Sequence, residues 1–472
     1  MIVHKFGGTS ITDAAGFLAA GQIILNQPHP SSATSAQNCA VVLSAIHGLT
    51  GALIQGGRLA AQGDDSGYRK IRLSLLEQHQ QIIEELPLAK NQQRILIGVI
   101  EDNLHELERL YRSIAILGEL TRRARDTVAA FGPILAVHIL SSLLQELGLR
   151  AEPVCTANLL ILDNSFGAAV PQMKPTGDAV KEHLAPMIHS GIVPILTASI
   201  GTTAEGVPAM LERGGGDTSA VALAAALHAA ECFIWTDVDG ILTADPAFVA
   251  DAIPLPELSY PQAAELARFG ADVLHPDTLQ PGARAGFPLQ IRSSFHPSRS
   301  GTRISNMPAG SDCILPAILS MTGLSMIVVH GEEHNWSLQI AARMLDTLFH
   351  TGVEVLMFSQ PMSAPGLNLI IREQDQEFAI KSLQQTLGQT RLAGLTFEHR
   401  QKAAIITIVS INGSGAVSKE RLFSETFSAL GEKNTPVFAI ARSANGSSLS
   451  FCIPEESCGE LVAFLHKKLI MG

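Results

Sequence analysis

Two glycine-rich segments of the chain carry the residue types that bind and neutralise phosphate. The first reads KFGGTS at residues 5–10, where a strand-like segment passes into a helical one. Glycines let backbone N–H groups approach an oxyanion, a helix N-terminus adds partial positive charge, and Lys5 supplies a full charge. The segment lacks the G-x-x-x-x-G-K-[ST] spacing of a P-loop. A tight strand-to-helix turn with a surface lysine therefore remains the alternative interpretation.

The second segment reads RGGGD at residues 213–217 and opens a clean helical run. Its three glycines free the backbone, and the planar guanidinium of Arg213 suits a carboxylate. Asp217 is placed to cap a helix that begins at Thr218. These features predict an anion site, with an ordinary glycine-rich loop and a capping aspartate as the alternative.

A third segment, WTDVDGILTADP at residues 235–246, places Asp237 and Asp239 directly after a strand-like run. Acidic residues with glycine at the carboxyl end of a strand are typical of a nucleotide crevice in an open α/β sheet. The histidines show no metal-binding spacing, and His275, which precedes a proline, is interpreted as structural. We therefore expect no protein-held metal.

Strands and helices alternate through the first two-thirds of the chain, which predicts a mostly parallel sheet covered on both faces. The expected strands lie at residues 1–7, 39–45, 191–199 and 231–239, and the first helix lies at residues 12–25. Residues 64–146 differ, because Leu, Gln, Glu and Arg recur there at helical spacing. We interpret this stretch as an inserted helical subdomain.

The last third of the chain changes character beyond a linker-like segment at residues 303–312. Residues 326–373 and 403–454 each read as strand, helix, strand and strand, with a helix expected to follow, and the offset is about 80 residues. This pattern predicts a duplicated α+β sandwich. A single α+β domain that happens to look symmetric is the alternative.

Composition limits the class of protein. The chain has 472 residues, 46% of them hydrophobic, and a formal net charge of −11. It shows no basic run of the kind that binds nucleic acid and no apolar run of membrane-spanning length. Six scattered cysteines without a C-x-x-C pair fit buried thiols in a reducing cytoplasm. We expect a cytoplasmic protein that binds neither nucleic acid nor membrane.

Taken in order, these motifs resemble those of aspartokinases, of the amino-acid kinase family. The shared segments are KFGGTS, VVLSA with Thr50, RGG-x-D, WTDVDG, FGA-x-VLHP and the closing GT at residues 301–302. The resemblance covers the whole chain. It implies a three-layer α/β sandwich at residues 1–305 with the helical insertion at 64–146. Two ACT-like, ferredoxin-like domains are then implied at 313–395 and 396–472, the layout of the kinase portion of bifunctional aspartokinase–homoserine dehydrogenases.

The resemblance also implies roles for single residues. Lys5 would stabilise the transferring phosphoryl group, and Asp217 would orient Lys5. Thr50, Arg213 and Gly216 would contact the amino-acid substrate, with Arg213 clamping its α-carboxylate. The nucleotide-binding residues would be Gly7, Gly8, Ser10, Thr236, Asp237, Asp239 and Gly240. ATP and Mg²⁺ are the implied cofactors, and pairing through the ACT-like domains implies a homodimer or tetramer.

The chain departs from the family pattern mainly at the site. Pro133 replaces a glutamate that meets the substrate ammonium, and proline offers neither charge nor N–H. Asp272 replaces a phosphate-binding lysine and counts against ordinary binding of ATP and Mg²⁺. Further departures are Ala198 and Ser199 for Gly-Phe, residues 207–210 for a threonine-rich run, Gly216 for serine and Ala247 for arginine.

Each lost charged contact typically costs about 2–5 kcal/mol. Arg123, Arg125 and Arg268 lie close in sequence to changed positions and are the candidates for compensation. Three functions are open: a phosphotransferase for the carboxylate of L-aspartate or a related amino acid with altered or weak activity, a non-catalytic regulatory or scaffold subunit, or a repurposed enzyme that uses the old carboxylate and phosphate site.

Overall fold

The computed structural model describes the chain at residues 1–26, 38–165, 169–211, 214–269, 274–306, 316–331, 336–361, 365–388, 395–411, 419–444 and 446–471. The chain divides into two compact units. The first contains Met1–Ile241, Pro256–Ala264 and Asp272–Pro308, and the second contains Leu242–Leu255, Glu265–Ala271 and Ala309–Gly472. The proposed domain limits at 305, 313 and 395 remain predictions, and each unit is described by itself.

An eight-stranded, mostly parallel sheet forms the centre of the first unit, in the order β3-β5-β2-β1-β8-β10-β11-β9. Among the described strands of this sheet, β10 and β11 form the antiparallel pair and the other neighbours are parallel. The strands are β1 (Ile2–Phe6), β2 (Cys39–Leu43), β3 (Ala151–Val154), β5 (Val193–Thr197), β8 (Glu231–Thr236), β9 (Glu257–Ser259), β10 (Leu289–Ser293) and β11 (Thr302–Ser305). The four strands expected from the sequence are thus present. A small second sheet contains β4 (Ile161–Leu162), β6 (Ile200–Thr203) and β7 (Pro208–Met210).

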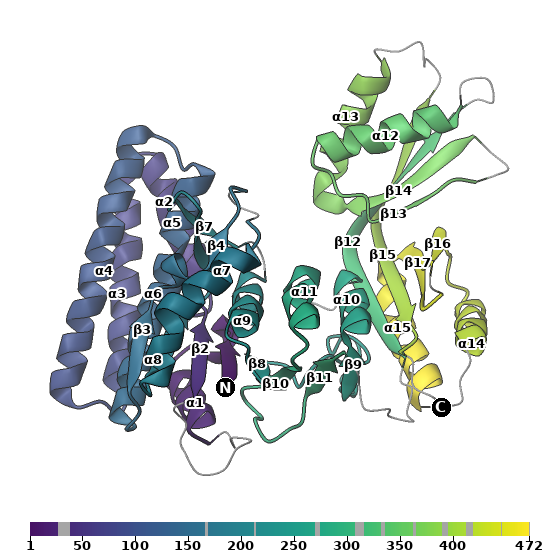
Figure 1. The fold of residues 1–472 in the computed structure, drawn as a ribbon. Helices are drawn as coiled ribbons and strands as arrows, with labels where there is room; N and C mark the ends of the chain where they lie inside the picture. The colour runs from purple at the N-terminus through teal and green to yellow at the C-terminus, as the bar shows by residue number, and fades with distance from the viewer. Residues whose placement is uncertain are drawn as a thin grey trace. The chain divides into compact units, whose positions relative to one another are not determined.

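Helices cover both faces of the large sheet, so the three-layer prediction is confirmed (Figure 1). Side chains alternate along β1, so Phe6 faces a core that includes α1 and α6, while Lys5 faces α9. The helices around the sheet are α1 (Ala14–Asn26), α2 (Leu49–Ala61), α7 (Met173–Ala179), α8 (Ala185–His189), α9 (Gly215–Ala226), α10 (Tyr260–Arg268) and α11 (Pro276–Ala285).

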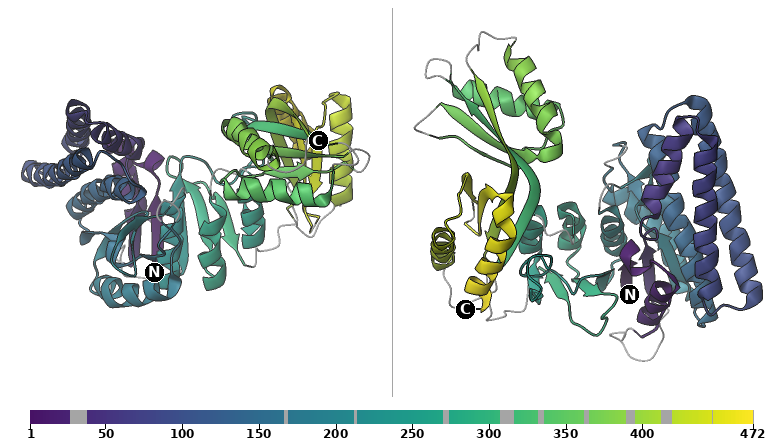
Figure 2. Two further views of the ribbon diagram at one scale, coloured as in Figure 1. Left: turned by 90° about the horizontal axis from the view of Figure 1, so that it is seen from above. Right: turned by 180° about the vertical axis from the view of Figure 1, so that it is seen from behind.

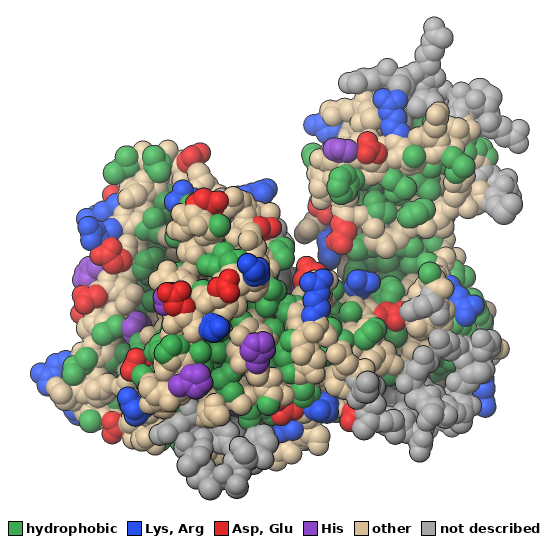
Figure 3. Space-filling view, in the orientation of Figure 1, with side chains coloured by type: hydrophobic (Ala, Val, Ile, Leu, Met, Phe, Trp, Pro, Cys, Tyr) green, Lys and Arg blue, Asp and Glu red, His purple; other side chains and the backbone are tan. Residues whose placement is uncertain are grey.

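Four helices make up the predicted insertion: α3 (Asp65–Glu85), α4 (Lys90–Leu117), α5 (Arg122–Ala129) and α6 (Phe131–Glu146). Asp64 starts the first of them, because its carboxylate accepts a hydrogen bond from Gly67 N at 2.9 Å. The long helices α3 and α4 lie side by side in all views (Figures 1 and 2). Acidic and basic side chains are interspersed on their outer surface, as solvated helices require (Figure 3).

The helical stretch Arg122–Glu146 corrects the expectation that no apolar run reaches membrane-spanning length. It is 25 residues long and, among the described residues, is the helical stretch apolar enough to cross a membrane by length and composition. However, 72% of its most apolar window is buried inside the protein, as in the core helix of a soluble protein. Pro133 supplies no N–H for the carbonyl of Ala129, which accounts for the break between α5 and α6 at Ala130.

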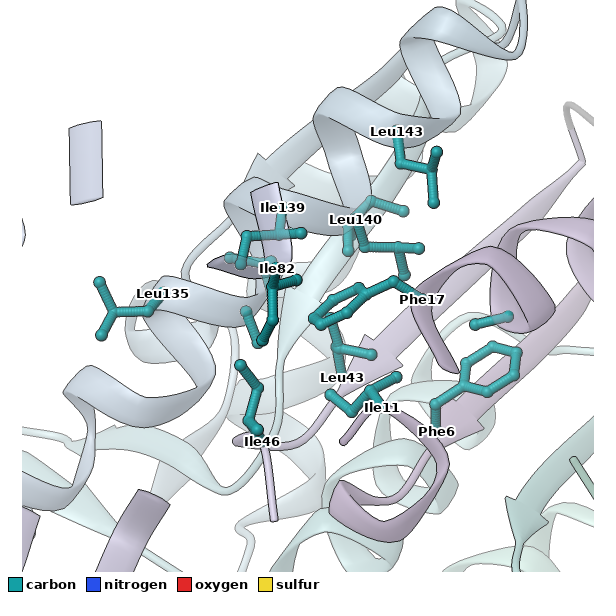
Figure 4. Packing of buried hydrophobic residues seen from close by; sticks show 14 of the residues in the cluster. Phe6, Ile11, Phe17, Leu43, Ile46, Ile82, Leu135, Ile139, Leu140 and Leu143 are labelled. Atoms are coloured by element: carbon teal, nitrogen blue, oxygen red, sulfur yellow. The ribbon is translucent and has the colours of Figure 1, made fainter. Parts of the chain in front are cut away.

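The core of the first unit joins the insertion to the sheet. Figure 4 shows Phe17 of α1 among Leu140 of α6, Leu43 of β2 and Ile11, and all four side chains are fully buried. Burying an aliphatic or aromatic side chain of this size stabilises a fold by about 1.5–3 kcal/mol. The insertion therefore packs as part of the unit that holds β1 and β2, and it fixes the position of the loops after these strands.

The second unit contains one six-stranded antiparallel sheet in the order β13-β14-β12-β15-β17-β16. Its elements are β12 (Ala317–His330), α12 (Leu338–His350), β13 (Met357–Ser359), β14 (Gly366–Arg372), α13 (Gln376–Gly388), β15 (Thr396–Val409), α14 (Lys419–Glu432), β16 (Ala439–Arg442), β17 (Ser448–Pro454) and α15 (Cys458–His466). The predicted duplicated order is present.

The two long strands β12 and β15 are longer than the sequence pattern indicates, and both are shared between two cores. Ile318 of β12 packs with α14 and α15, whereas Ile327 of the same strand packs with α12 and α13. Figure 1 shows these helix pairs at opposite ends of the two strands. Each core thus draws residues from both halves of the duplicated sequence.

Candidate active site

A buried ion pair joins the first two motifs. Lys5 Nζ lies 2.7 Å from Asp217 Oδ1, and the two side chains are only 10% and 12% exposed. Lys5 belongs to β1, and Asp217 belongs to the first turn of α9, which starts after Gly214 in a left-handed conformation (φ 77°). A side chain at Gly214 would also meet His275 Cβ at 2.8 Å, so only glycine fits there.

Glycines keep the surroundings of Lys5 open. A Cβ atom at Gly7 would lie 3.3 Å from Lys5 Nζ, and one at Gly216 would lie 3.3 Å from Lys5 Cε and 2.9 Å from Ser44 Oγ. At Gly8 a Cβ atom would lie 2.6 Å from the carbonyl oxygen of Ala45, so the loops after β1 and β2 touch at this point. Together these glycines form a cradle around the ammonium group that side chains would fill.

The loops after β1, β8 and β10 meet at the same edge of the sheet. Gly7 N donates to Trp235 O at 3.2 Å. Ser294 Oγ donates to Ser10 Oγ at 2.8 Å and is 3.1 Å from Thr236 O. The hydroxyl of Ser10 is therefore buried in a network that ties three strand ends together, and Thr236 lies at the edge of that network.

The remaining predicted nucleotide residues follow β8. Asp237 is exposed and its carboxylate accepts a hydrogen bond from Thr236 Oγ1 at 3.0 Å. Asp239 forms an ion pair with Arg299. Gly240 has a φ of 122°, and a Cβ atom there would lie 2.6 Å from Thr302 Oγ1. This close approach packs the turn after β8 against the closing Gly-Thr motif.

A cavity of about 750 Å³ opens beside the ion pair. Its walls come from the ends of β2, β5 and β7 and from the starts of α2, α5, α6 and α9. The lining residues are Ser44, Ala45, Thr50, Ile54, Arg122, Arg125, Asp126, Ala129, Pro133, Ala198, Ser199, Met210, Leu211 and Gly214–Gly216. Because Gly216 lies against the Lys5 side chain, the cavity and the ion pair form one site.

Burial and nearby negative charges keep the thiol of Cys232, on the strand next to Lys5, unreactive. Cys232 of β8 is fully buried, and burial raises the pKa of its thiol strongly, with further increases from the charges of Asp217 and Glu231. The thiol therefore stays protonated.

Comparison with known proteins identifies the scaffold. Residues 1–293, more than half of the chain, match the amino acid kinase family. The chain belongs to the amino acid kinase family. The resemblance inferred from the motifs is thus confirmed, and the chain is a kinase homologous to aspartokinases.

Relatives of this amino acid kinase align over nearly its whole length. Aspartokinase 1, chloroplastic, of Arabidopsis thaliana is 28% identical over 98% of this chain and 79% of that protein. A bifunctional aspartokinase/homoserine dehydrogenase of Haemophilus influenzae is 27% identical over 99% of this chain, which spans 56% of that relative's length. The chain spans about half the length of the other bifunctional relatives that it matches.

Solved structures show the same fold. Escherichia coli aspartokinase III in complex with aspartate and ADP superposes with a TM-score of 0.80 at 25% identity, with 99% of each chain covered. Clostridium acetobutylicum aspartate kinase superposes with a TM-score of 0.73 at 20% identity and supports the fold alone. The three-layer kinase fold with a C-terminal α+β region is therefore shared across the chain.

Five of the noted departures line the cavity of this amino acid kinase. They are Pro133, Ala198, Ser199, Met210 and Gly216. Ser199 has a φ of 66°, an unusual conformation for a residue other than glycine. Thr50 and Gly216, the expected substrate contacts, line the same cavity.

Other predicted residues lie elsewhere. Arg213 and Asp272 lie outside the described residues, so their roles stay predictions. Ala247 is exposed and belongs to the second unit, as does Arg268. Arg125 lines the cavity as one of the three candidate compensating arginines, whereas Arg123 does not.

Sequence reasoning missed several cavity residues. Ser44 follows β2 within a motif that we quoted, so its position was available as a signal. Arg122 and Asp126 lie on α5, inside the insertion, and no motif marks them. Asp126 is buried and accepts a hydrogen bond from Met210 N at 3.3 Å, which ties α5 to β7. That tertiary contact is what brings the insertion into the site.

Proposed function

We propose that this chain transfers the γ-phosphoryl group of ATP to a side-chain carboxylate of L-aspartate or a related acid. A carboxylate oxygen forms a bond to the γ-phosphorus while the bond to the β,γ-bridging oxygen breaks, which yields an acyl phosphate and ADP. The observation that carries this proposal is the buried Lys5–Asp217 pair beside a large cavity. The bound aspartate and ADP of the E. coli relative support it.

Lys5 would act on the transferring group. Phosphoryl transfer needs positioning and charge neutralisation and little covalent chemistry from the protein. Asp217 holds the ammonium of Lys5 at 2.7 Å, and the glycines beside it leave room for phosphate oxygens. Thr50 and Arg213 would bind the acceptor, with Arg213 on a carboxylate as the family pattern implies.

The described residues fit a polyphosphate. The glycine cradle around Lys5 is the space that Cβ atoms would otherwise fill, and the N-termini of α9 and α11 start beside each other at Gly214 and His275. Both helix ends favour negative charge. Thr236 and Asp237 would contact the nucleotide from the loop after β8. Mg²⁺, arriving with the nucleotide, would neutralise charge on the phosphate oxygens.

A hydroxylamine trapping assay tests the function. The protein is incubated with MgATP, an acidic acceptor and hydroxylamine, and the acyl hydroxamate is measured together with ADP. We expect product with the unaltered protein and a loss of about 10²–10³-fold in kcat for Lys5→Met. Arg109→Met, an exposed change on α4, is the control and should leave the rate unchanged. ADP release without hydroxamate for every acceptor would refute the proposal.

A second candidate is a repurposed or non-catalytic member of the family. Pro133 favours it, because the family glutamate that meets the substrate ammonium is missing from the cavity wall. A repurposed enzyme would form hydroxamate from an acid other than aspartate. A regulatory or scaffold subunit would bind neither ATP nor acceptor in calorimetry, and binding of either would exclude it.

We also propose a homo-oligomer, a dimer or tetramer, formed through the ACT-like region of the second unit. The duplicated sheet of six strands with two helix pairs supports this proposal. We propose a cytoplasmic, reducing location as well. The thiols of Cys39 and Cys452 are buried, and burial raises the pKa of each to about 12. Light scattering measures the first proposal, and localisation of a tagged chain measures the second.

A further inference from the structure

Two arginines in the cavity wall favour the binding of ligands with additional negative charge. Arg122 and Arg125 lie one turn apart on α5 and both line the cavity. Within the described part of the chain, neither side chain has an ion pair or a hydrogen bond, and both residues are exposed. A guanidinium offers five N–H donors in a fixed planar fork that matches a carboxylate or phosphate. The cavity thus presents two guanidinium groups without protein partners in that part of the chain.

The position of these arginines costs helix stability. Thr121 caps α5 by accepting a hydrogen bond from Ala124 N at 3.1 Å, so Arg122 and Arg125 lie in its first turns. Positive charge at a helix N-terminus opposes the helix dipole, and the first turn of α5 contains no acidic residue to offset it. An unfavourable charge at a helix end that no other contact offsets is typical of functional positions.

The net charge of the cavity lining also favours an anionic ligand. Among the described residues, the charged ones that line it are Arg122, Arg125 and Asp126, which sum to one positive charge. The carboxylate of Asp126 already accepts the N–H of Met210. Pro133 adds no negative charge where the family has a glutamate. An ammonium group entering this cavity therefore gains little, whereas an additional anionic group is attracted.

The size of the cavity allows a larger acceptor. Cavities of about 300–1,000 Å³ hold ligands well above the size of aspartate, and this one measures about 750 Å³. Ile54 and Met210 provide apolar walls, and the small side chains Ala198 and Ser199 stand where the family has Gly-Phe.

We propose that the acceptor is a carboxylic acid with an additional anionic group in place of the ammonium of aspartate, and that Arg122 and Arg125 bind this group. The inference rests on the proposed function, because it specifies the acceptor of that phosphoryl transfer. The arginines share the cavity with Thr50 and Pro133, whereas Thr236 and Asp237 do not line it. The anion is therefore assigned to the acceptor and not to the nucleotide.

Calorimetry without ATP tests the inference separately from catalysis. The probes are L-aspartate, succinate and tricarballylate, which differ in the ammonium and in a third carboxylate. We expect tricarballylate to bind most tightly and L-aspartate least tightly. The Arg122→Gln/Arg125→Gln double variant should lose at least tenfold affinity for tricarballylate and change little toward succinate. Arg123→Gln removes one positive charge from the same helix outside the cavity, and it should bind like the unaltered protein.

Three results would overturn the inference. One is tighter binding of L-aspartate than of both other acids by the unaltered protein. Another is an equal loss of affinity in Arg123→Gln and in the double variant, since that would indicate a general field effect. The third is a loss of ADP affinity alone in the double variant, which would assign the arginines to the nucleotide. Absence of hydroxamate with intact tricarballylate binding would refute the proposed function and with it the acceptor assignment, and would leave only the binding of the anionic group by Arg122 and Arg125.

Discussion

The Lys5–Asp217 pair should be the most strongly coupled ion pair of the first unit. Both side chains are about nine-tenths buried and their charged atoms lie 2.7 Å apart. Removing one partner leaves an uncompensated charge in a poorly solvated place, which typically costs about 3–5 kcal/mol. We therefore expect Lys5→Met and Asp217→Asn each to lower the free energy of unfolding by about 3 kcal/mol or more.

Removing both partners together should cost much less than the sum. The double variant Lys5→Met/Asp217→Asn contains no buried charge at this point, and replacement of a buried pair by neutral groups is often close to neutral. The interaction energy from the double-mutant cycle should therefore be at least about 2 kcal/mol. Urea unfolding followed by circular dichroism and by tryptophan fluorescence measures each free energy.

An exposed pair provides the control for this cycle. Arg109 and Glu106 of α4 lie 2.8 Å apart, but their side chains are 73% and 61% exposed. Exposed pairs contribute about 0.2–1 kcal/mol, so the cycle of Arg109→Met with Glu106→Gln should give a coupling near the low end of that range. Additive losses at Lys5 and Asp217, with a coupling no larger than in the control pair, would refute the reasoning from burial.

Three further predictions concern pH and backbone. Burial lowers the pKa of His79 below its ordinary value, so the unfolded chain takes up a proton at a higher pH than the folded protein does. The free energy of unfolding should therefore fall as the pH drops below about 6.5. His79→Leu should make this free energy less dependent on pH, as measured by urea titrations at pH 5–7. Gly8→Ala should lower the free energy of unfolding by about 1–3 kcal/mol, because the added Cβ atom meets the carbonyl oxygen of Ala45. Gly51→Ala lies in α2 with open space around it, and it should raise the free energy of unfolding by up to about 1 kcal/mol in the same assay. Ser199→Gly should raise the thermal midpoint slightly, because glycine tolerates the positive φ, and an unchanged or lower midpoint would contradict this.

The elements that could be predicted are those whose pattern is local. The strands β1, β2, β5 and β8 are continuous buried apolar runs next to helical periodicity, which is what a parallel sheet requires. The short strands β9 and β11 were missed, because three or four residues leave no periodic signal. The full length of β12 was also missed, since its first part pairs with residues of β15 that lie about 90 positions further along the chain.

The residues of the candidate site also fall into those that local motifs predict and those that only tertiary packing brings to the site. Lys5, Asp217 and Thr50 follow from motifs, and these motifs place each residue at the end of a strand or the start of a helix. Arg125 is a candidate for compensation only because it lies close in sequence to a changed position, and no motif marks Arg122. Only the packing of α5 against β7, through the bond from Met210 N to Asp126, brings both residues to the cavity.

This division explains why the sequence located the lost contacts, whereas among the candidate compensating arginines it could not tell which one lines the cavity. Pro133 occupies a motif position, so the missing carboxylate is evident from the residue type alone. A replacement charge need not arise at the same position, because a cavity wall collects side chains from elements that are distant in sequence. A divergent motif therefore indicates that the ligand contacts have changed, and the walls of the folded cavity indicate which ligand chemistry has replaced them.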